Sequence, residues 1–337
     1  MINSNNSFSH IYVEKSVYEH PNTTHILSEF SGSKIILINN YKDLFNRKNQ
    51  NKHTQGLSQN IILARKTSGF LYPGAPVCQS FGNPYFFYSS NIMNCLFDCS
   101  YCFLKGMYQS RNIVIFVNIE DTFNAVMEMK KIKNPLYISV SYDTDLIAAN
   151  GILPLDEMWQ NFAASNHDVS IEIRTKCGIS PHFKKLLNQS SGSSATVFAF
   201  TISPQNICSA FEKKTANLYS RIDAINYAFK CNVPVRLCFD PMIYTYGWRD
   251  KYLSMLEILD SKISWESLND VSIGSFRVSK EYLSEMRKCE PSNQIVQFPF
   301  ETLNGYASYP AHIRSEMESF LMTELSKRLP VKKIFIW

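Results

Sequence analysis

The most constraining feature of this 337-residue sequence is the alternation of short apolar runs with longer amphipathic stretches between about residues 84 and 275. Strand-like and helix-like segments at this spacing predict βαβ units, in which helices join parallel strands. About six such units form an open, incomplete (β/α)6 barrel with its chemistry at the carboxyl ends of the strands. We therefore expect an α/β fold. The expected strands are 85–88, 112–117, 136–140, 169–174, 195–202, 235–239 and 271–274, and the expected helices are 99–107, 119–131, 155–166, 181–187, 218–230 and 248–259.

Two further regions flank the partial barrel. Strand-like runs at 34–38 and 61–64, separated by a polar stretch, predict an N-terminal α/β layer. We place this layer at residues 1–80, the barrel at 81–280 and a C-terminal extension at 281–337.

The composition excludes several classes of protein. Hydrophobic residues make up 45% of the chain and charged residues 19%, which excludes a disordered chain or a coiled coil. No run of about 20 apolar residues occurs, so no membrane-spanning helix is expected. Nine cysteines cannot all pair, and we expect a reducing, cytoplasmic location. The net charge of +5 permits a polyanionic partner such as DNA but does not require one.

Three cysteines stand close together in the pattern C-x3-C-x2-C, at Cys95, Cys99 and Cys102. A helix starting at Cys99 would place Cys99 and Cys102 on one face, and Cys95 would reach the same point from the preceding loop. Three thiolates suit a cubane iron–sulfur cluster in which one iron keeps a position free for another ligand. The alternatives are a structural zinc site, which would need a fourth ligand, and plain apolar packing. A zinc or nucleic-acid-binding module without enzymatic activity is the corresponding alternative function.

With this motif the chain resembles the radical S-adenosylmethionine superfamily, and within it the spore photoproduct lyase family. The segments that are similar to the family occur along the chain in the same order as in the family. They are 11–15, 62–66, 99–104, 114–118, 143–145, 174–176, 200–202, 221–224, 240–243 with 247–248, and 305–310. It implies a [4Fe–4S] cluster on the three cysteines, S-adenosylmethionine as the second cofactor, and a 5′-deoxyadenosyl radical. It further implies a lyase that opens a methylene-bridged thymine dimer in DNA, and a reductant such as flavodoxin or ferredoxin as a partner.

The resemblance also implies roles for residues near the predicted strand ends. Lys176 is expected to contact the carboxylate of S-adenosylmethionine, and Thr144 and Asp145 its amino group or ribose. Tyr101 is expected to cover the adenine or the methionine moiety, and Thr201 to touch the cofactor. The alternatives are a solvated strand end for Lys176, helix capping for Thr144 and Asp145, and core packing for Tyr101 and Thr201.

The sequence departs from the family where the substrate radical is quenched. The hydrogen-donor cysteine of the family falls on Tyr142, or on Ser141 after a one-residue slip, and Phe103 replaces a tyrosine of the cluster loop. A tyrosine can form a radical, so Tyr142 and Tyr101 are the expected catalytic residues. Cys177 is a substitute donor if its side chain turns inward, and a buried structural cysteine otherwise. A related radical S-adenosylmethionine enzyme with a different substrate is therefore the alternative function.

Overall fold

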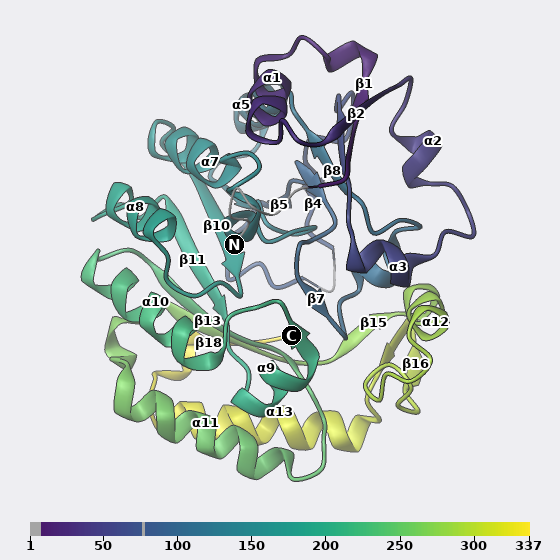
Figure 1. Ribbon diagram of the computed structural model, residues 1–337. Coiled ribbons are helices and arrows are strands. Elements are labelled where there is room, and N and C mark those ends of the chain that lie inside the picture. Colours follow the sequence, from purple (N-terminus) through teal and green to yellow (C-terminus); the bar gives the residue numbers. More distant parts are fainter. Residues whose placement is uncertain (1–7, 76–77) are drawn as a thin grey trace.

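Two sheets organise the chain in the computed structural model, which describes residues 8–75 and 78–337 (Figure 1). The smaller sheet has the strand order β2-β1-β3-β8-β6 and carries the short helices α1, α2 and α3. Its strands run parallel except for β6, which is antiparallel to β8. The bounds are β1 His10–Glu14, β2 Lys34–Ile38, β3 Ile61–Ala64, β6 Ile92–Met93, β8 Ile113–Phe116, α1 Pro21–Glu29, α2 Lys42–Phe45 and α3 Lys52–Leu57.

The larger sheet is the expected partial barrel, with the strand order β18-β14-β13-β11-β10-β9-β5-β4. All of its strands from β5 to β18 pair in parallel, and only β4 is antiparallel. The strands are β4 Tyr72–Pro73, β5 Phe86–Tyr88, β9 Leu136–Ser139, β10 Val169–Thr175, β11 Thr196–Thr201, β13 Val235–Met242, β14 Asp270–Ser275 and β18 Ile334–Ile336.

Helices cover the outer face of this sheet and confirm the predicted alternation (Figure 1). They cover one side of the strands, and the packed interior covers the other, so β9 and β11 are buried at every residue, as in other parallel sheets. The helices of this part of the chain, which include the short α6 and α9 after the strand ends, are α5 Ile119–Ile132, α6 Leu146–Ala149, α7 Leu155–Ala164, α8 Pro181–Gln189, α9 Gln205–Phe211, α10 Leu218–Lys230, α11 Trp248–Lys262 and α13 Ala311–Ser326.

One expected barrel strand belongs to the other sheet. The run at 112–117 forms β8, which pairs with β3 through Ile61 and Ile113 in the smaller sheet. A short apolar run buried on both faces looks the same in either sheet, so its pattern does not say which sheet it joins. The boundaries at residues 80 and 280 remain predictions, and residues 1–7 of the predicted N-terminal layer lie outside the described part.

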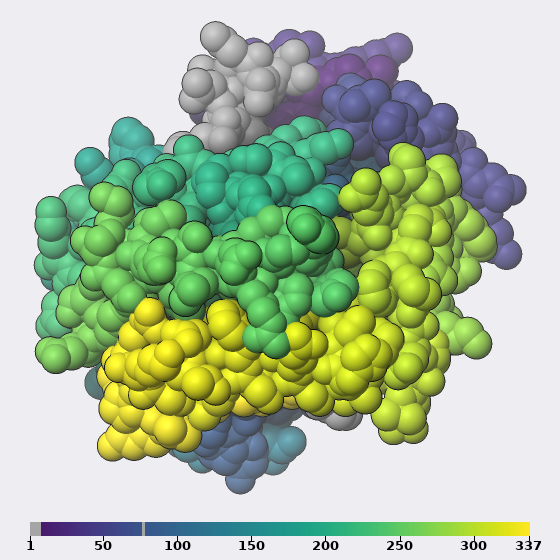
Figure 2. Space-filling model, turned by 90° about the horizontal axis from the view of Figure 1, so that it is seen from below, coloured from purple at the N-terminus to yellow at the C-terminus, as the bar shows by residue number. Residues whose placement is uncertain are grey.

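The C-terminal residues close the barrel sheet and build a small unit beside the cluster loop. β18 pairs with β14, while β15 (Arg277–Ser279), β17 (Tyr306–Ser308) and β16 (Glu301–Leu303) form a three-stranded sheet next to α12 (Lys280–Cys289). Seen from below, the yellow C-terminal chain lies alongside the yellow-green residues of this unit (Figure 2). No helix in residues 8–75 and 78–337 is long and apolar enough to cross a membrane.

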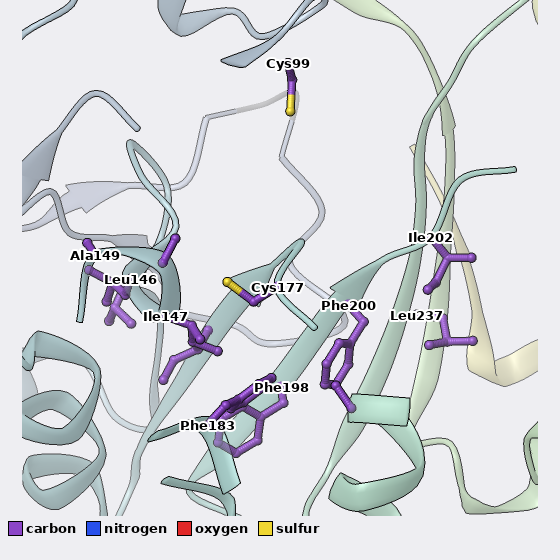
Figure 3. Close-up of a cluster of buried hydrophobic side chains, with 14 of the residues drawn as sticks. Cys99, Leu146, Ile147, Ala149, Cys177, Phe183, Phe198, Phe200, Ile202 and Leu237 are labelled. Atoms are coloured by element: carbon purple, nitrogen blue, oxygen red, sulfur yellow. The ribbon is translucent and has the colours of Figure 1, made fainter. Parts of the chain in front are cut away.

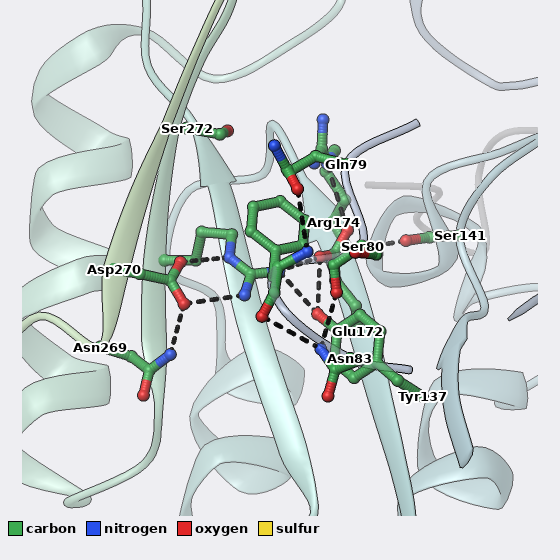
Figure 4. A network of polar contacts seen from close by, with 12 residues as sticks. Gln79, Ser80, Asn83, Tyr137, Ser141, Glu172, Arg174, Asn269, Asp270 and Ser272 are labelled. Atoms are coloured by element: carbon green, nitrogen blue, oxygen red, sulfur yellow. Dashed lines mark hydrogen bonds and ion pairs between the residues drawn. The ribbon is translucent and has the colours of Figure 1, made fainter. Parts of the chain in front are cut away.

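A buried polar network joins four strands inside the barrel (Figure 4). Arg236 is 2% exposed; it binds Asp270 with an Nη2–Oδ2 distance of 2.8 Å and also donates to Glu172 and Tyr137. Its guanidinium lies 3.2 Å from the ring centre of Phe81. Burial by itself would raise the pKa of Glu172, but nearby arginine charges lower it. Arg236 and Asp270 lie near the starts of β13 and β14, so this network fills the interior away from the carboxyl strand ends.

Candidate cofactor and radical site

The cysteine loop is held by a short strand and a turn. Cys99 lies in β7 (Asp98–Cys99), which pairs antiparallel with β12 (Glu212–Lys213). The Cys102 amide donates to the Cys99 carbonyl at 3.2 Å, and α4 (Leu104–Met107) begins only two residues later. The helix predicted over 99–107 is therefore wrong for its first five residues. A turn, and not a helical face, sets the spacing of Cys99 and Cys102.

The three thiols lie near one another in apolar surroundings. All are free; Cys99 is buried, and Cys95 and Cys102 are partly buried. Burial, Asp145 and Cys102 raise the pKa of Cys95 to about 12. Burial also raises the pKa of Cys99, and both other cysteines are close enough to add to this. Figure 3 shows Cys99 on its loop, with Cys177 and the buried core of the barrel on the strands beyond.

This donor set fits a [4Fe–4S] cluster. Each cysteine of such a cluster binds a different iron, so the sulfurs need not surround one point, and three cysteines leave one iron open. Within the described ranges, no three His, Cys, Asp or Glu side chains are grouped closely enough for a single metal ion. Cys95, Cys99 and Cys102 are thus the residues that would hold the cluster.

A buried ion pair supports the region beside the cysteines. Glu212 binds Arg221 with an Nη2–Oε2 distance of 2.5 Å and accepts the Tyr101 hydroxyl. The Lys176 ammonium lies 5.7 Å from the centre of the Tyr101 ring. Burial would raise the pKa of Glu212, but the charges of Arg221 and Lys176 lower it to about 2. The structure therefore brings the predicted residues Lys176 and Tyr101 together beside Cys99.

Glu212 is a site residue that the sequence analysis missed. It lies 111 positions from Tyr101, and only the β7–β12 pairing brings it to the cysteine loop. Arg221 belongs to a segment that resembles the family, and its Nη1 donates to the Thr201 carbonyl at 2.9 Å. Thr201 itself is buried at the end of β11. No local pattern marks a glutamate whose partners all come from other segments.

Asp145 is fully engaged in hydrogen bonds within the chain. Its carboxylate caps α6 by accepting the Ala148 amide at 3.1 Å, and it accepts the Lys176 amide at 2.8 Å and the Thr175 hydroxyl at 3.0 Å. Burial raises its pKa. Asp145 therefore performs the capping role that we kept as the alternative. Thr144 beside it is also buried, and contacts of either residue with the cofactor remain predictions.

Two residues predicted to take part in the radical chemistry, Tyr142 and Cys177, have different neighbours. Tyr142 packs against Phe103, with 5.8 Å between ring centres, and stacks on Tyr88 at 4.2 Å. Cys177 is buried, and its Sγ lies 3.7 Å from Asp145. Its sulfur points towards the side chains of α6 in Figure 3. The catalytic roles of Tyr142, Tyr101 and Cys177 remain predictions.

The fold and the three-cysteine loop define the class of protein as a cluster-binding partial barrel, and comparisons with known proteins agree. The family model described as spore photoproduct lyase matches residues 9–288. A search of curated proteins gives no match. A solved spore photoproduct lyase complexed with dinucleoside spore photoproduct is 15% identical, covers 97% of both chains and superposes with a TM-score of 0.79. A doubly substituted variant with bound AdoMet and the same dinucleoside is 16% identical, also covers 97% of both chains and also gives 0.79.

The chain belongs to the spore photoproduct lyase family, because the family model spans most of its length. It is therefore a radical S-adenosylmethionine enzyme of the lyase type, with a [4Fe–4S] cluster and S-adenosylmethionine as cofactors. The structural likeness confirms the partial-barrel fold. The alternative of a non-enzymatic zinc or nucleic-acid-binding module is wrong.

Proposed function

We propose that this enzyme repairs the methylene-bridged thymine dimer of DNA. The observation that carries the proposal is the family match over 9–288, together with a cysteine loop whose Tyr101 lies against Lys176, the residue that follows β10 at its carboxyl end. The solved relatives named above carry the dinucleoside form of this lesion, which supports the same substrate here. The chromosome is the source of such a substrate, so we place the activity in the cytoplasm.

When bound, the cluster and S-adenosylmethionine supply a 5′-deoxyadenosyl radical. In this proposal Lys176 offers its ammonium to the methionine carboxylate, a charge-assisted hydrogen bond. Burial lowers the pKa of Lys176, but Cys99 and Glu212 raise it above its usual value, so it is positively charged at neutral pH. Tyr101 is fixed by Glu212 and carries Lys176 on its ring face. Thr144, Asp145 and Thr201 complete the proposed cofactor pocket.

The experiment combines the reconstituted enzyme with S-adenosylmethionine, dithionite and dinucleoside spore photoproduct without oxygen. We expect the released thymidine dinucleotide and 5′-deoxyadenosine to be detected by liquid chromatography with mass spectrometry. Flavodoxin or ferredoxin, the proposed physiological reductants, should replace dithionite. Cleavage of S-adenosylmethionine with no repair of the lesion would contradict the proposed substrate.

A second candidate function is a related radical reaction on another substrate. It is favoured by one specific feature, the presence of Tyr142 where the family has its hydrogen-donor cysteine. The same assay separates the two candidates, because only the second predicts a cofactor-competent enzyme that leaves the dinucleoside unchanged.

A further inference from the structure

The segment that begins at Cys78 runs through the inside of the partial barrel. Phe81 lies against Arg236 and packs on Phe335 of β18, with 5.3 Å between ring centres. The Gln79 amide donates to the Ile336 carbonyl at 3.1 Å. In Figure 4, Gln79 lies beside Arg174. Gln79 and Phe81 therefore pack in the filled interior of the sheet, whereas Cys78 at the start of the segment reaches Tyr142, which follows β9 at the carboxyl ends of the strands, where partial barrels hold their substrates.

Cys78 makes a specific contact there. Its Sγ donates to the Tyr142 hydroxyl at 3.8 Å, so the segment supplies a thiol to the residue that occupies the family's donor position. Tyr142 also contacts Phe103, the residue that follows the cluster ligand Cys102. Burial raises the pKa of Cys78, opposed by Tyr142 and nearby arginines, so the group is a neutral thiol at neutral pH. A neutral thiol carries the hydrogen atom that a radical quench needs.

Two further observations point to a ligand and to an electron path. Asp143 is 4% exposed; Ser90 and Tyr108 hydrogen-bond to its carboxyl group, but Oδ1 has no hydrogen-bond partner in the described part of the chain, which leaves one buried acceptor atom for another group. Tyr142 stacks on Tyr88, and Tyr88 on Tyr72 at 5.0 Å. Because Tyr72 is 37% exposed, the three rings lead from the Cys78 contact to the surface.

We propose that Cys78 is the hydrogen-atom donor of this enzyme and that Tyr142 restores its thiol; this rests on the proposed repair function. The S–H bond breaks homolytically, and its hydrogen atom forms the new C–H bond of the product. The thiyl radical then takes the phenolic hydrogen atom of Tyr142. The tyrosyl radical returns to phenol by gaining one electron from the same low-potential one-electron reductant that serves the cluster, and one proton from water.

The test follows deuterium into the product. In D2O both the thiol and the phenol exchange, so we expect the wild-type product to carry one solvent deuterium. C78A should still release 5′-deoxyadenosine while its deuterated product falls at least tenfold. Y142F should give about one deuterated product per enzyme and then stop. C289A removes a cysteine in α12 and serves as the matched control, with wild-type labelling.

A binding measurement covers the case in which a variant folds poorly. On the wild-type chain, dinucleoside spore photoproduct should protect Cys78 from N-ethylmaleimide, with Cys289 as the internal reference in the mass spectrum. The inference is overturned if the product of C78A carries as much solvent deuterium as the wild-type product. It is also overturned if the deuterium is lost in C177A and not in C78A, or if the dinucleoside leaves the alkylation of Cys78 unchanged. A wild-type enzyme that makes no product overturns the proposed function and this inference with it, whereas full repair by C78A overturns the inference alone.

Discussion

Removing the charge of Glu212 should strongly destabilise the region beside the cysteine loop. Glu212 is 2% exposed and Arg221 0%, so Glu212→Gln leaves a buried guanidinium without a counter-charge. Breaking such a pair costs about 3–5 kcal/mol of unfolding free energy. The pKa of about 2, against an ordinary value of 4.5, expresses the same interaction as about 3 kcal/mol.

Chemical denaturation of the cluster-free proteins at pH 7 measures this loss. Glu212→Leu combined with Arg221→Met replaces the whole pair, and we expect the double variant to be more stable than the sum of its single changes by at least about 2 kcal/mol. Additive single effects, or a Glu212→Gln variant within about 1 kcal/mol of wild type, would refute the reasoning.

The same pair predicts a pH dependence. The folded-state pKa of Glu212 is depressed, so its contribution to stability is present above pH 4.5 and is lost as the pH falls from 4.5 towards 2. The wild type should therefore lose its advantage over Glu212→Gln on acidification. A difference that stays constant down to pH 3 would assign the effect to packing and not to charge.

Three other changes test separate parts of the account. Gly106→Ala should cost about 1–3 kcal/mol in denaturation, because a Cβ there would overlap the backbone of Tyr282 in α12, whereas Gly32→Ala, with open space around it, should cost far less. Arg236→Met should cost about 3–5 kcal/mol by leaving the buried Asp270 carboxylate without its ion pair and Glu172 with Arg174 as its remaining one, and Arg236→Lys should recover part of this. Lys176→Met should weaken S-adenosylmethionine binding roughly tenfold to a hundredfold in calorimetry with the cluster absorbance unchanged; unchanged affinity would contradict its assigned contact.

Local sequence patterns were sufficient for most of the fold. The runs that became β10, β11 and β13 are apolar, β-branched and separated by amphipathic stretches, so their type and order follow from periodicity. The membership of β8 does not, because pairing partners are set by packing between distant segments. The spacing of the three cysteines indicated a cluster in the same way, although a turn, and not a helix, arranges Cys99 and Cys102.

The surroundings of the cysteines were beyond local reasoning. Glu212 reaches the site only through the pairing of β12 with β7, and Cys78 meets Tyr142 across 64 positions. No residue next to Glu212 or Cys78 in the sequence forms a motif with it, so a local pattern does not mark either residue as part of the site. Cys177 was the expected replacement donor because it lies next to Lys176, whereas the structure places a second thiol, Cys78, against Tyr142 itself.

The most direct test of the central claim is the iron, sulfide and optical spectrum of the anaerobically reconstituted protein, compared with Cys99→Ala. We expect about four irons and four sulfides per chain with broad brown absorbance, and loss of all three signals in the variant. A wild-type protein that stays colourless and iron-free, or a variant that keeps its cluster, would contradict the assignment of Cys95, Cys99 and Cys102.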